Sequence, residues 1–377
     1  MRPWPRADRL ATGLAAAGVF LVAWGLVHRW FWAHGAIVDW PTYQAYGDQM
    51  KAGAVPYRDF AVEYPPGALP VFLLPSELGG SYAATFAWLM AACGIVLVLV
   101  VGFARSSAAF FTALAPVLAG SLILSRFDLW PALLATAALV ALLSNRHALG
   151  WGLLGAAVAA KLWPLVFVPV ALVWSYRRGR VRSAFWGAGV AAGAFVPFLV
   201  LAPGGLWSSL SGQLSRPLQI ESLGAAFLTT FGRPAVVTSH GSQNVVGHGA
   251  VAAALSVAQA FVLVALWVAF ARGPATGERL VRFAAACTCA FVAFDKVLSP
   301  QYLLWLIPLV PLVRGRRGLL AAGLLTAALV LTQVWFPQRY FDYALHFRLA
   351  GVVLARDLVL VALVAVLALP APLARAS

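Results

Sequence analysis

The chain of 377 residues is 62% hydrophobic and only 10% charged, which excludes a soluble globular domain. Apolar runs of about 20 residues recur along its whole length, and a helix needs about that span to cross the hydrocarbon of a bilayer. The net charge of +15 does not indicate a nucleic-acid partner, because the cations lie in short tufts between apolar runs, where they orient a membrane protein.

The first predicted element is a membrane helix over residues 10–31, preceded by three arginines. It is too long for a signal peptide and lacks the small-residue cleavage pattern. The polar stretch 39–67 follows within the first extracytoplasmic loop, 32–81, and contains four acids, four tyrosines and four prolines. A linker needs none of these, so we interpret the stretch as the catalytic face of a membrane enzyme. The apolar run 66–78 is too short to cross and is expected to be re-entrant or interfacial.

Residues 148–174 decide the predicted topology. As one long helix they place the basic loop 176–182 outside, whereas two short helices meeting near Lys161 and Pro164 return it to the inside, as the positive-inside rule favours. The sequence therefore predicts an all-α, polytopic integral membrane protein, a single domain over 1–377 with about 12 transmembrane helices, some short, and both termini inside. The remaining spans are expected at 82–103, 108–124, 129–143, 184–201, 250–270, 280–294, 301–313, 318–336 and 349–369.

The distribution of charge agrees with this topology. The inner side receives 16 of the 27 cations but only two of the 12 acids, Asp8 and Glu278. Acids contribute little to orientation, so the ten outer acids need another cause, and we expect a polar reaction chamber on the outer face. The inner cations are Arg2, Arg6, Arg9, Arg105, Arg146, Arg177, Arg178, Arg180, Arg182, Arg272, Arg279, Arg282, Arg314, Arg316, Arg317 and Arg375.

Several polar segments besides 39–67 fall on that outer face. Each mixes cations, acids and aromatic residues, as a site for a sugar and a phosphate does, because Arg and Lys bind phosphate while carboxylates and amides bind hydroxyls. They are the turn 125–128, the junction at Lys161, the long loop 203–249, and the segments 295–308 and 337–348.

Asp39 allows two interpretations. It precedes Pro41, and proline favours the first turn of a helix, so Asp39 suits the start of an amphipathic interfacial helix over 41–52 with Tyr43, Tyr46 and Met50 on one stripe. A carboxylate at this position also suits a catalytic base.

Two charged sites fall inside apolar runs. A charged lysine in an apolar segment costs free energy, so Lys161 is expected to be functional. The alternative is a snorkelling lysine that marks the tip of a helical hairpin. Arg356 and Asp357 are interpreted as an ion pair buried between helices.

Other residues carry weaker signals. Cys93, Cys287 and Cys289 lie in apolar runs and are interpreted as small core residues rather than as disulfides or zinc ligands. His240 and His248 form a weak metal signal without a third ligand nearby. Gly189 and Gly193 are expected to form a helix-packing face. The sequence contains no Walker loop, dinucleotide fingerprint, HExxH, GxSxG or Asp-x-Asp pair.

The order of motifs resembles a known family. An Asp follows the first span, a tyrosine-bearing helix comes next, and then G-x-x-P-Y-x-x-F-x-x-E-Y-P-P-G spans Gly53 to Gly67. K-x-x-P at Lys161, R-P-L-Q-I-E-S from Arg216 and S-P-Q-Y-L-L-W from Ser299 follow in order. The chain resembles the polyprenyl-phosphate-mannose-dependent α-mannosyltransferases of glycosyltransferase family 87, which have the GT-C fold. The E-Y-P-P-G block is the most specific of these matches.

The resemblance implies an inverting enzyme with its active site on the extracytoplasmic face. Asp39 would be the general base that takes the proton of the acceptor hydroxyl. The leaving phosphate needs no acid, so cations would stabilise it. The candidates for the donor phosphate are Lys161, Arg126, Arg216, Lys296 and, more weakly, Arg58. The candidates for binding the sugar and acceptor are Glu63, Tyr64, Tyr57, Glu221, Gln301, Tyr302 and His240.

The expected reaction moves a hexose, mannose first, from a polyprenyl-phosphate donor to a lipid or glycan acceptor in the plasma membrane. Membrane lipids, the donor and the acceptor are the expected partners, and no cofactor is expected; the sequence leaves a metal requirement open. One alternative is a related transferase for arabinofuranose or glucose. Another is a transporter of a lipid-linked sugar, which the absence of an internal repeat and the one-sided charges disfavour.

Overall fold

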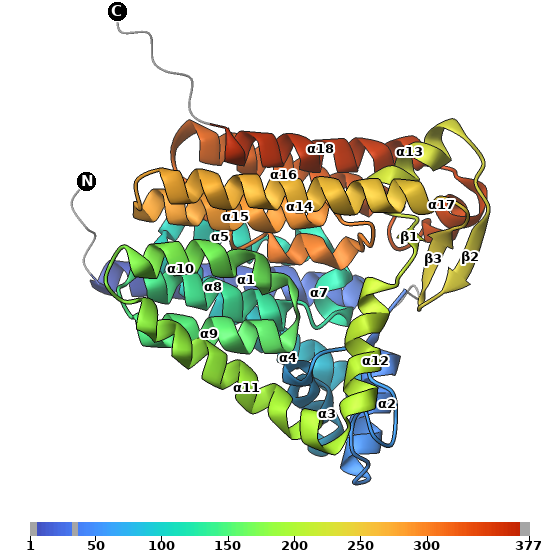
Figure 1. Cartoon of the computed structure of the whole chain (residues 1–377), viewed down its shortest axis with the longest axis horizontal. Helices are drawn as coiled ribbons and strands as arrows, with labels where there is room; N and C mark the ends of the chain where they lie inside the picture. The colour runs from blue at the N-terminus through green and yellow to red at the C-terminus, as the bar shows by residue number, and fades with distance from the viewer. Residues whose placement is uncertain (1–5, 32–36, 370–377) are drawn as a thin grey trace, which may run out of the picture.

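The computed structural model describes residues 6–31 and 37–369, so Arg2 and Arg375 of the predicted inner set lie outside the described residues. Figure 1 shows long helices running side by side, with α1 beginning and α18 ending at the same end of the bundle. In the described part of the chain, six helices are long and apolar enough to cross a membrane, and shorter apolar helices accompany them. The prediction of an all-α polytopic membrane protein is confirmed.

The N-terminal part packs α1 (Arg6–Phe31) against α4 (Tyr82–Ala104). Between them lie α2 (Trp40–Lys51), the 3₁₀ turn η2 (Pro66–Ala68) and α3 (Leu69–Leu78). As predicted, α2 buries Tyr43 and Tyr46 and leaves its charged side exposed. The short α3 packs on α2 and α4.

The predicted third span is a broken helix rather than a continuous one. It consists of α5 (Ser106–Ala113), α6 (Ala115–Ala119) and α7 (Leu122–Ser125). Pro116 has no N–H to donate, and Gly120 has a positive φ of 57°, so the helical ladder cannot run through 108–124.

The predicted break in residues 148–174 is present. After α8 (Leu129–Leu143), α9 (His147–Ala160) ends where Lys161 becomes extended, and the 3₁₀ helix η3 (Trp163–Phe167) leads into α10 (Val168–Tyr176). Pro164 cannot donate a helical hydrogen bond, which favours a new start there.

The expected loop 203–249 is instead largely structured. A short η4 (Val181–Ser183) and α11 (Ala184–Leu201) precede α12 (Pro203–Leu214), β1 (Leu218–Gln219), α13 (Leu223–Phe231), β2 (Val236–Ser239) and β3 (Ser242–Val245). The three antiparallel strands lie in the order β1-β3-β2. His240 and Gly241 both have positive φ, as a two-residue hairpin turn requires.

The C-terminal part contains α14 (Gly249–Arg272), α15 (Gly277–Phe294), α16 (Gly315–Trp335), α17 (Tyr340–His346) and α18 (Ala350–Ala368). The expected span 301–313 is not an α-helix but two 3₁₀ pieces, η5 (Pro300–Trp305) and η6 (Val310–Leu312), because prolines recur through it. Arg356 and Asp357 form the predicted ion pair, at 2.6 Å, and both are fully buried.

The glycine prediction on α11 is wrong. A Cβ added at Gly189 or Gly193 would meet no other atom, so neither lies at a helix contact. The contact with α9 is made by Gly187 and Gly155, where a Cβ would collide with the facing backbone. The apolar surface of α9 fixes the rotation of α11, and this places the later glycines on the outside.

Candidate active site

Asp39 stands at the N-cap position of α2, where its main-chain oxygen accepts from Thr42 and Tyr43. Its side chain makes no capping hydrogen bond. The carboxylate instead forms an ion pair with Arg126, and its second oxygen lies 3.4 Å from the Tyr43 hydroxyl. The side chain is 29% exposed, so one side of the carboxylate stays open. The main chain and the side chain of Asp39 thus have separate roles. The main chain starts α2, and the carboxylate binds Arg126 of the bundle.

Arg126 and Asp128 lie on the turn between α7 and α8. Both are buried, and Asp128 is fully inaccessible. Asp128 Oδ1 accepts from Lys161 Nζ at 2.6 Å and from Trp305 Nε1 at 2.7 Å. Three segments far apart in the sequence therefore converge on one carboxylate.

Lys161 is held in an aromatic enclosure as well as by Asp128. Its Nζ lies 4.9 Å from the centroid of Phe127, 5.3 Å from Tyr302 and 5.1 Å from Trp305. Tyr302 stacks on Trp305 with centroids 4.2 Å apart. Ring faces attract a cation, so the ammonium group is fixed in place rather than free to reach the surface. This arrangement does not fit the snorkelling alternative.

We call Asp39, Arg126, Asp128, Lys161 and Trp305 the inner cluster. Its two carboxylates and two cations balance in charge, and a buried charge is tolerated when it is paired and hydrogen-bonded. The Nε of Arg126 and Oδ2 of Asp128 have no partner among the described residues. The inner cluster is therefore neutral as a set, with polar atoms left over for a ligand.

Glu221 lies in the buried segment before α13, near enough to Arg126 to act on it electrostatically. Its main-chain oxygen accepts from Arg356 Nη2 at 2.8 Å, which ties the loop to α18. Burial raises the pKa of the Glu221 carboxyl to about 7, against the opposing effects of hydrogen bonds from its own backbone and the Gln219 side chain. The Glu221 carboxyl is therefore protonated more readily than that of an exposed glutamate.

η5 itself carries Gln301 and Tyr302 and brings Tyr302 to Lys161. Ser299 Oγ donates to Gln301 Oε1 at 2.5 Å, so the amide is oriented. Burial raises the pKa of the nearby Asp295 to about 6. Lys296, expected at the phosphate, donates instead to the Leu214 carbonyl at 2.8 Å, at the end of α12.

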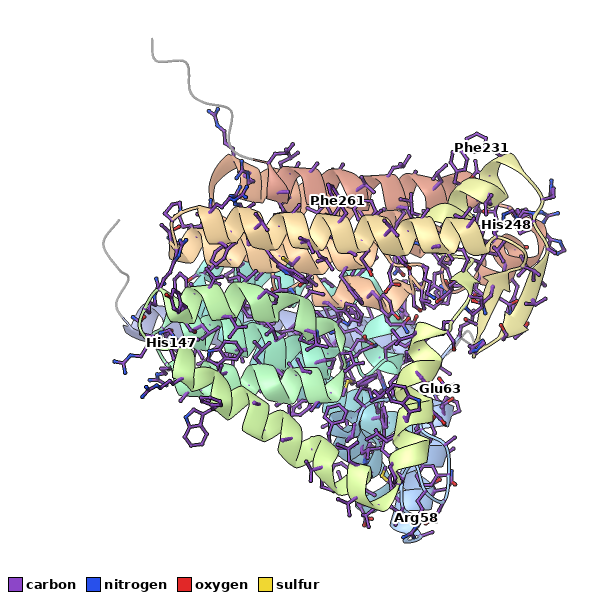
Figure 2. The ribbon with its side chains drawn as sticks, viewed as in Figure 1. Arg58, Glu63, His147, Phe231, His248 and Phe261 are labelled. Atoms are coloured by element: carbon purple, nitrogen blue, oxygen red, sulfur yellow. The ribbon has the colours of Figure 1, made fainter. Side chains whose placement is uncertain are left out.

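A second group of predicted residues surrounds a cavity of about 440 Å³ between the segment 57–63 and α12. We call this cavity the outer pocket. Figure 2 shows Glu63 and Arg58 beside α12, far from His147 at the opposite end of the bundle. Of the predicted site residues, Tyr57, Arg58, Glu63, Arg216 and His240 line it.

The walls of the outer pocket are held by specific contacts. The Tyr57 hydroxyl donates to the Tyr64 main-chain oxygen at 2.6 Å, and Tyr57 itself has a positive φ of 64°. Tyr64 packs its ring against Phe72 and Phe127, and Phe127 in turn lies next to Lys161 of the inner cluster. Arg58 pairs with Asp59 at 2.9 Å. Arg216 donates to Ser242 Oγ and the His240 carbonyl.

Sequence reasoning missed Asp128, Trp305 and Tyr340 as site residues. Asp128 belongs to a polar turn in an apolar region, and that interruption was the available signal. Trp305 ends the S-P-Q-Y-L-L-W motif, and that motif was the available signal for it. Tyr340, whose hydroxyl interacts with the Glu221 carboxyl, carried no signal of its own. Within the described residues, no three His, Cys, Asp or Glu side chains are grouped to hold a metal ion.

Comparison with known families adds an independent finding. A family model described as glycosyltransferase family 87 matches residues 62–300. A model described as mannosyltransferase (PIG-M) matches residues 237–368. No curated protein matches the chain. Both matches include residues of the site: the first covers Arg126, Asp128 and Lys161 of the inner cluster, and the second covers His240 and the 299–305 segment with Trp305.

Proposed function

The chain belongs to glycosyltransferase family 87, and from that premise we propose that it transfers mannose from a polyprenyl-phosphate donor to a lipid or glycan hydroxyl. The observation that carries this proposal is the partly open Asp39 carboxylate, which pairs with the buried Arg126 next to the Lys161–Asp128 pair. The match to the mannosyltransferase model favours mannose over glucose or arabinofuranose.

Asp39 acts as the general base. The acceptor oxygen attacks the anomeric carbon as the bond from that carbon to the phosphate oxygen breaks, and Asp39 takes the acceptor proton. The products are the glycosylated acceptor, inverted at the anomeric carbon, and polyprenyl phosphate. The leaving phosphate is already stable as an anion, so no acid is required.

The donor phosphate binds at Arg126 and Lys161, with Arg216 adding positive potential nearby. The inner cluster is neutral when empty, so an anionic phosphate must share a cation that now holds a carboxylate. The unpartnered Nε of Arg126 offers a free donor for that purpose. Lys296 and Arg58 are weaker candidates, because each is already bonded elsewhere.

The sugar and acceptor are bound by the polar groups around this centre. Tyr302 borders the inner cluster, with Gln301 beside it in η5, and Glu221 is tied to α18 through Arg356. Glu63, Tyr57 and His240 line the outer pocket. Tyr64 supports the wall between the inner cluster and the outer pocket. Carboxylates and amides suit sugar hydroxyls, and aromatic faces suit the sugar ring.

The reaction takes place on the extracytoplasmic face of the plasma membrane. The support for this placement is the one-sided charge, since the cations that orient a membrane protein lie at the end of the bundle away from the site. A lipid-linked donor reaches that face through the bilayer. We expect no cofactor, and membrane lipids surround the bundle.

The test compares wild type with Asp39→Asn, using purified protein, polyprenyl-phosphate-mannose and a membrane lipid extract as the source of acceptor. We expect the variant to lose mannose transfer by about 10²–10⁴-fold, the usual contribution of a general base. Asp48→Asn is the matched control, because Asp48 lies on the same helix but bonds to Ser76 Oγ, away from the cluster. Transfer by Asp39→Asn at the wild-type rate would refute the mechanism.

The same assay tests the sugar. Replacing the donor by polyprenyl-phosphate-glucose or polyprenyl-phosphate-arabinofuranose should reduce transfer strongly. If one of these donors is used in preference to mannose, the family assignment stands and the mannose proposal fails.

A further inference from the structure

We propose that the outer pocket binds the glycan part of the acceptor, with one face of α12 as its floor; this inference rests on the proposed function. The cavity of about 440 Å³ falls within the range of about 300–1,000 Å³ typical of small-ligand sites. It adjoins the inner cluster through Arg216, which is near enough to Lys161 and Tyr302 to act on them electrostatically.

The floor of the pocket is a stripe of small residues on α12. Gly205, Ser208, Ser209 and Gly212 follow one another at spacings of three, one and three, which places them on one side of the helix. A Cβ at Gly205 would collide with the Tyr57 carbonyl, so this glycine lets the helix and the 57–63 segment approach closely. The cavity is open at Gly212, where an added Cβ would meet no other atom.

Within the part of the chain that the structure describes, two polar atoms in the outer pocket lack a hydrogen-bond partner. Ser209 Oγ and Arg216 Nε are buried and have no hydrogen-bond partner among the described residues. A buried polar atom without a partner costs free energy, so a ligand that satisfies it gains affinity. Two such atoms among the lining side chains indicate a ligand that accepts and donates hydrogen bonds.

The charges of the lining favour a neutral saccharide over a phosphate. Arg58 is neutralised by Asp59, and the exposed Glu63 would repel an anion. Sugar hydroxyls both donate and accept, and so they suit the carboxylate of Glu63 and the unpartnered Ser209 Oγ and Arg216 Nε together. Tyr57 and Phe60 add aromatic surface. The donor phosphate therefore belongs at the inner cluster, and the acceptor glycan in the outer pocket.

The experiment fills the pocket without straining the backbone. Gly212→Leu places a side chain in the cavity, and Gly204→Leu is its matched control, on the same helix but outside the lining, where an added Cβ also meets nothing. Leucine is the better helix former, so neither change should weaken α12. Ser208→Leu, on the same stripe, gives a second blocking variant.

Two reactions are measured with polyprenyl-phosphate-mannose: transfer to the acceptor in a membrane lipid extract, and release of free mannose to water without acceptor. We expect Gly212→Leu and Ser208→Leu to lose transfer at least tenfold while release to water and the donor KM stay within twofold of wild type. Gly204→Leu should match wild type in both.

Three outcomes separate the hypotheses. Unchanged transfer in both blocking variants overturns the inference, because a filled pocket would then be irrelevant. Equal loss of transfer and of release to water also overturns it, because the pocket would then hold the donor. If wild type transfers no mannose at all, the proposed function fails, and the pocket assignment fails with it.

Discussion

The two ends of the bundle use their cations differently. In the inner cluster the cations meet carboxylates: Arg126 pairs with Asp39 and Lys161 with Asp128. At the opposite end they meet main-chain oxygens, as Arg105 does with the Pro311 and Val313 carbonyls. Similar bonds join Arg177 to Ala271 and Gly273, Arg178 to Ala275, Arg279 to Ala269, and Arg282 to Leu369.

The difference separates orientation from chemistry. Carbonyls at the ends of helices carry partial negative charge, so arginines there stabilise loops without any acid, which is all that orientation in a bilayer requires. Buried carboxylate–cation pairs cost desolvation and contribute little net stability. Since these pairs are gathered at one end of the bundle and add little stability, we infer that they serve binding or catalysis there.

The largest expected effect is in cysteine labelling from outside the cell. Arg58→Cys, on the exposed rim of the outer pocket, should react with a membrane-impermeant maleimide on intact cells, and Tyr176→Cys, at the basic end, should not. Tyr57 is too buried for this purpose. The native cysteines are all buried and give little background. The reverse labelling pattern would show that the basic end, and not the site end, faces the outside of the cell.

The next effect concerns the buried pair in the inner cluster. Asp128→Asn leaves Lys161 unpaired and should reduce the free energy of unfolding by about 3–5 kcal/mol, with loss of transfer. Adding Lys161→Met should restore most of the stability, measured as Tm in detergent, but not the transfer. A double variant no more stable than the single one would show that the pair is not the cause.

A smaller effect concerns Glu221 and pH. Its pKa is about 7 in the folded protein against an ordinary value of 4.5. The folded state therefore holds a proton that the unfolded chain has lost, and stability falls as pH rises from about 4.5 to 7. Glu221→Gln should remove on the order of 1–3 kcal/mol of that fall, read as a flatter dependence of Tm on pH. Asp295, whose pKa is also raised, contributes to the slope that remains.

The smallest effect is expected at the basic end. Arg177→Gln removes hydrogen bonds to two carbonyls at the C-terminal end of α14 and should change transfer by less than about twofold, with a small fall in Tm. Arg126→Gln, assayed beside it, should reduce transfer far more. Equal losses in the two arginine variants would remove the contrast between the ends.

Much of the fold was predictable because membrane insertion acts locally. Apolar runs predicted the long helices, and the positive-inside rule placed the break at Lys161, which the structure contains. Prolines were a weaker guide: the run 301–313 was expected as a span, yet it forms 3₁₀ turns. Hydropathy indicates whether a segment lies in the membrane, but it does not indicate which backbone hydrogen bonds the segment forms.

The candidate site was predicted in part. Asp39, Arg126 and Lys161 were named from the sequence, and they lie together. That Arg126 holds Asp39, rather than standing free for a phosphate, followed only from the packing of α7 and α8 against α2. Asp128 and Trp305 are 177 positions apart, and no local pattern connects them.

The sequence by itself determined that this chain is a membrane protein with polar chemistry concentrated at one end, because composition and charge act segment by segment on insertion. Only the tertiary structure decided which polar residues form the inner cluster of paired charges and which line the outer pocket against α12. That division depends on close approaches such as Gly205 against Tyr57. Such contacts join segments through packing, which a one-dimensional pattern does not record.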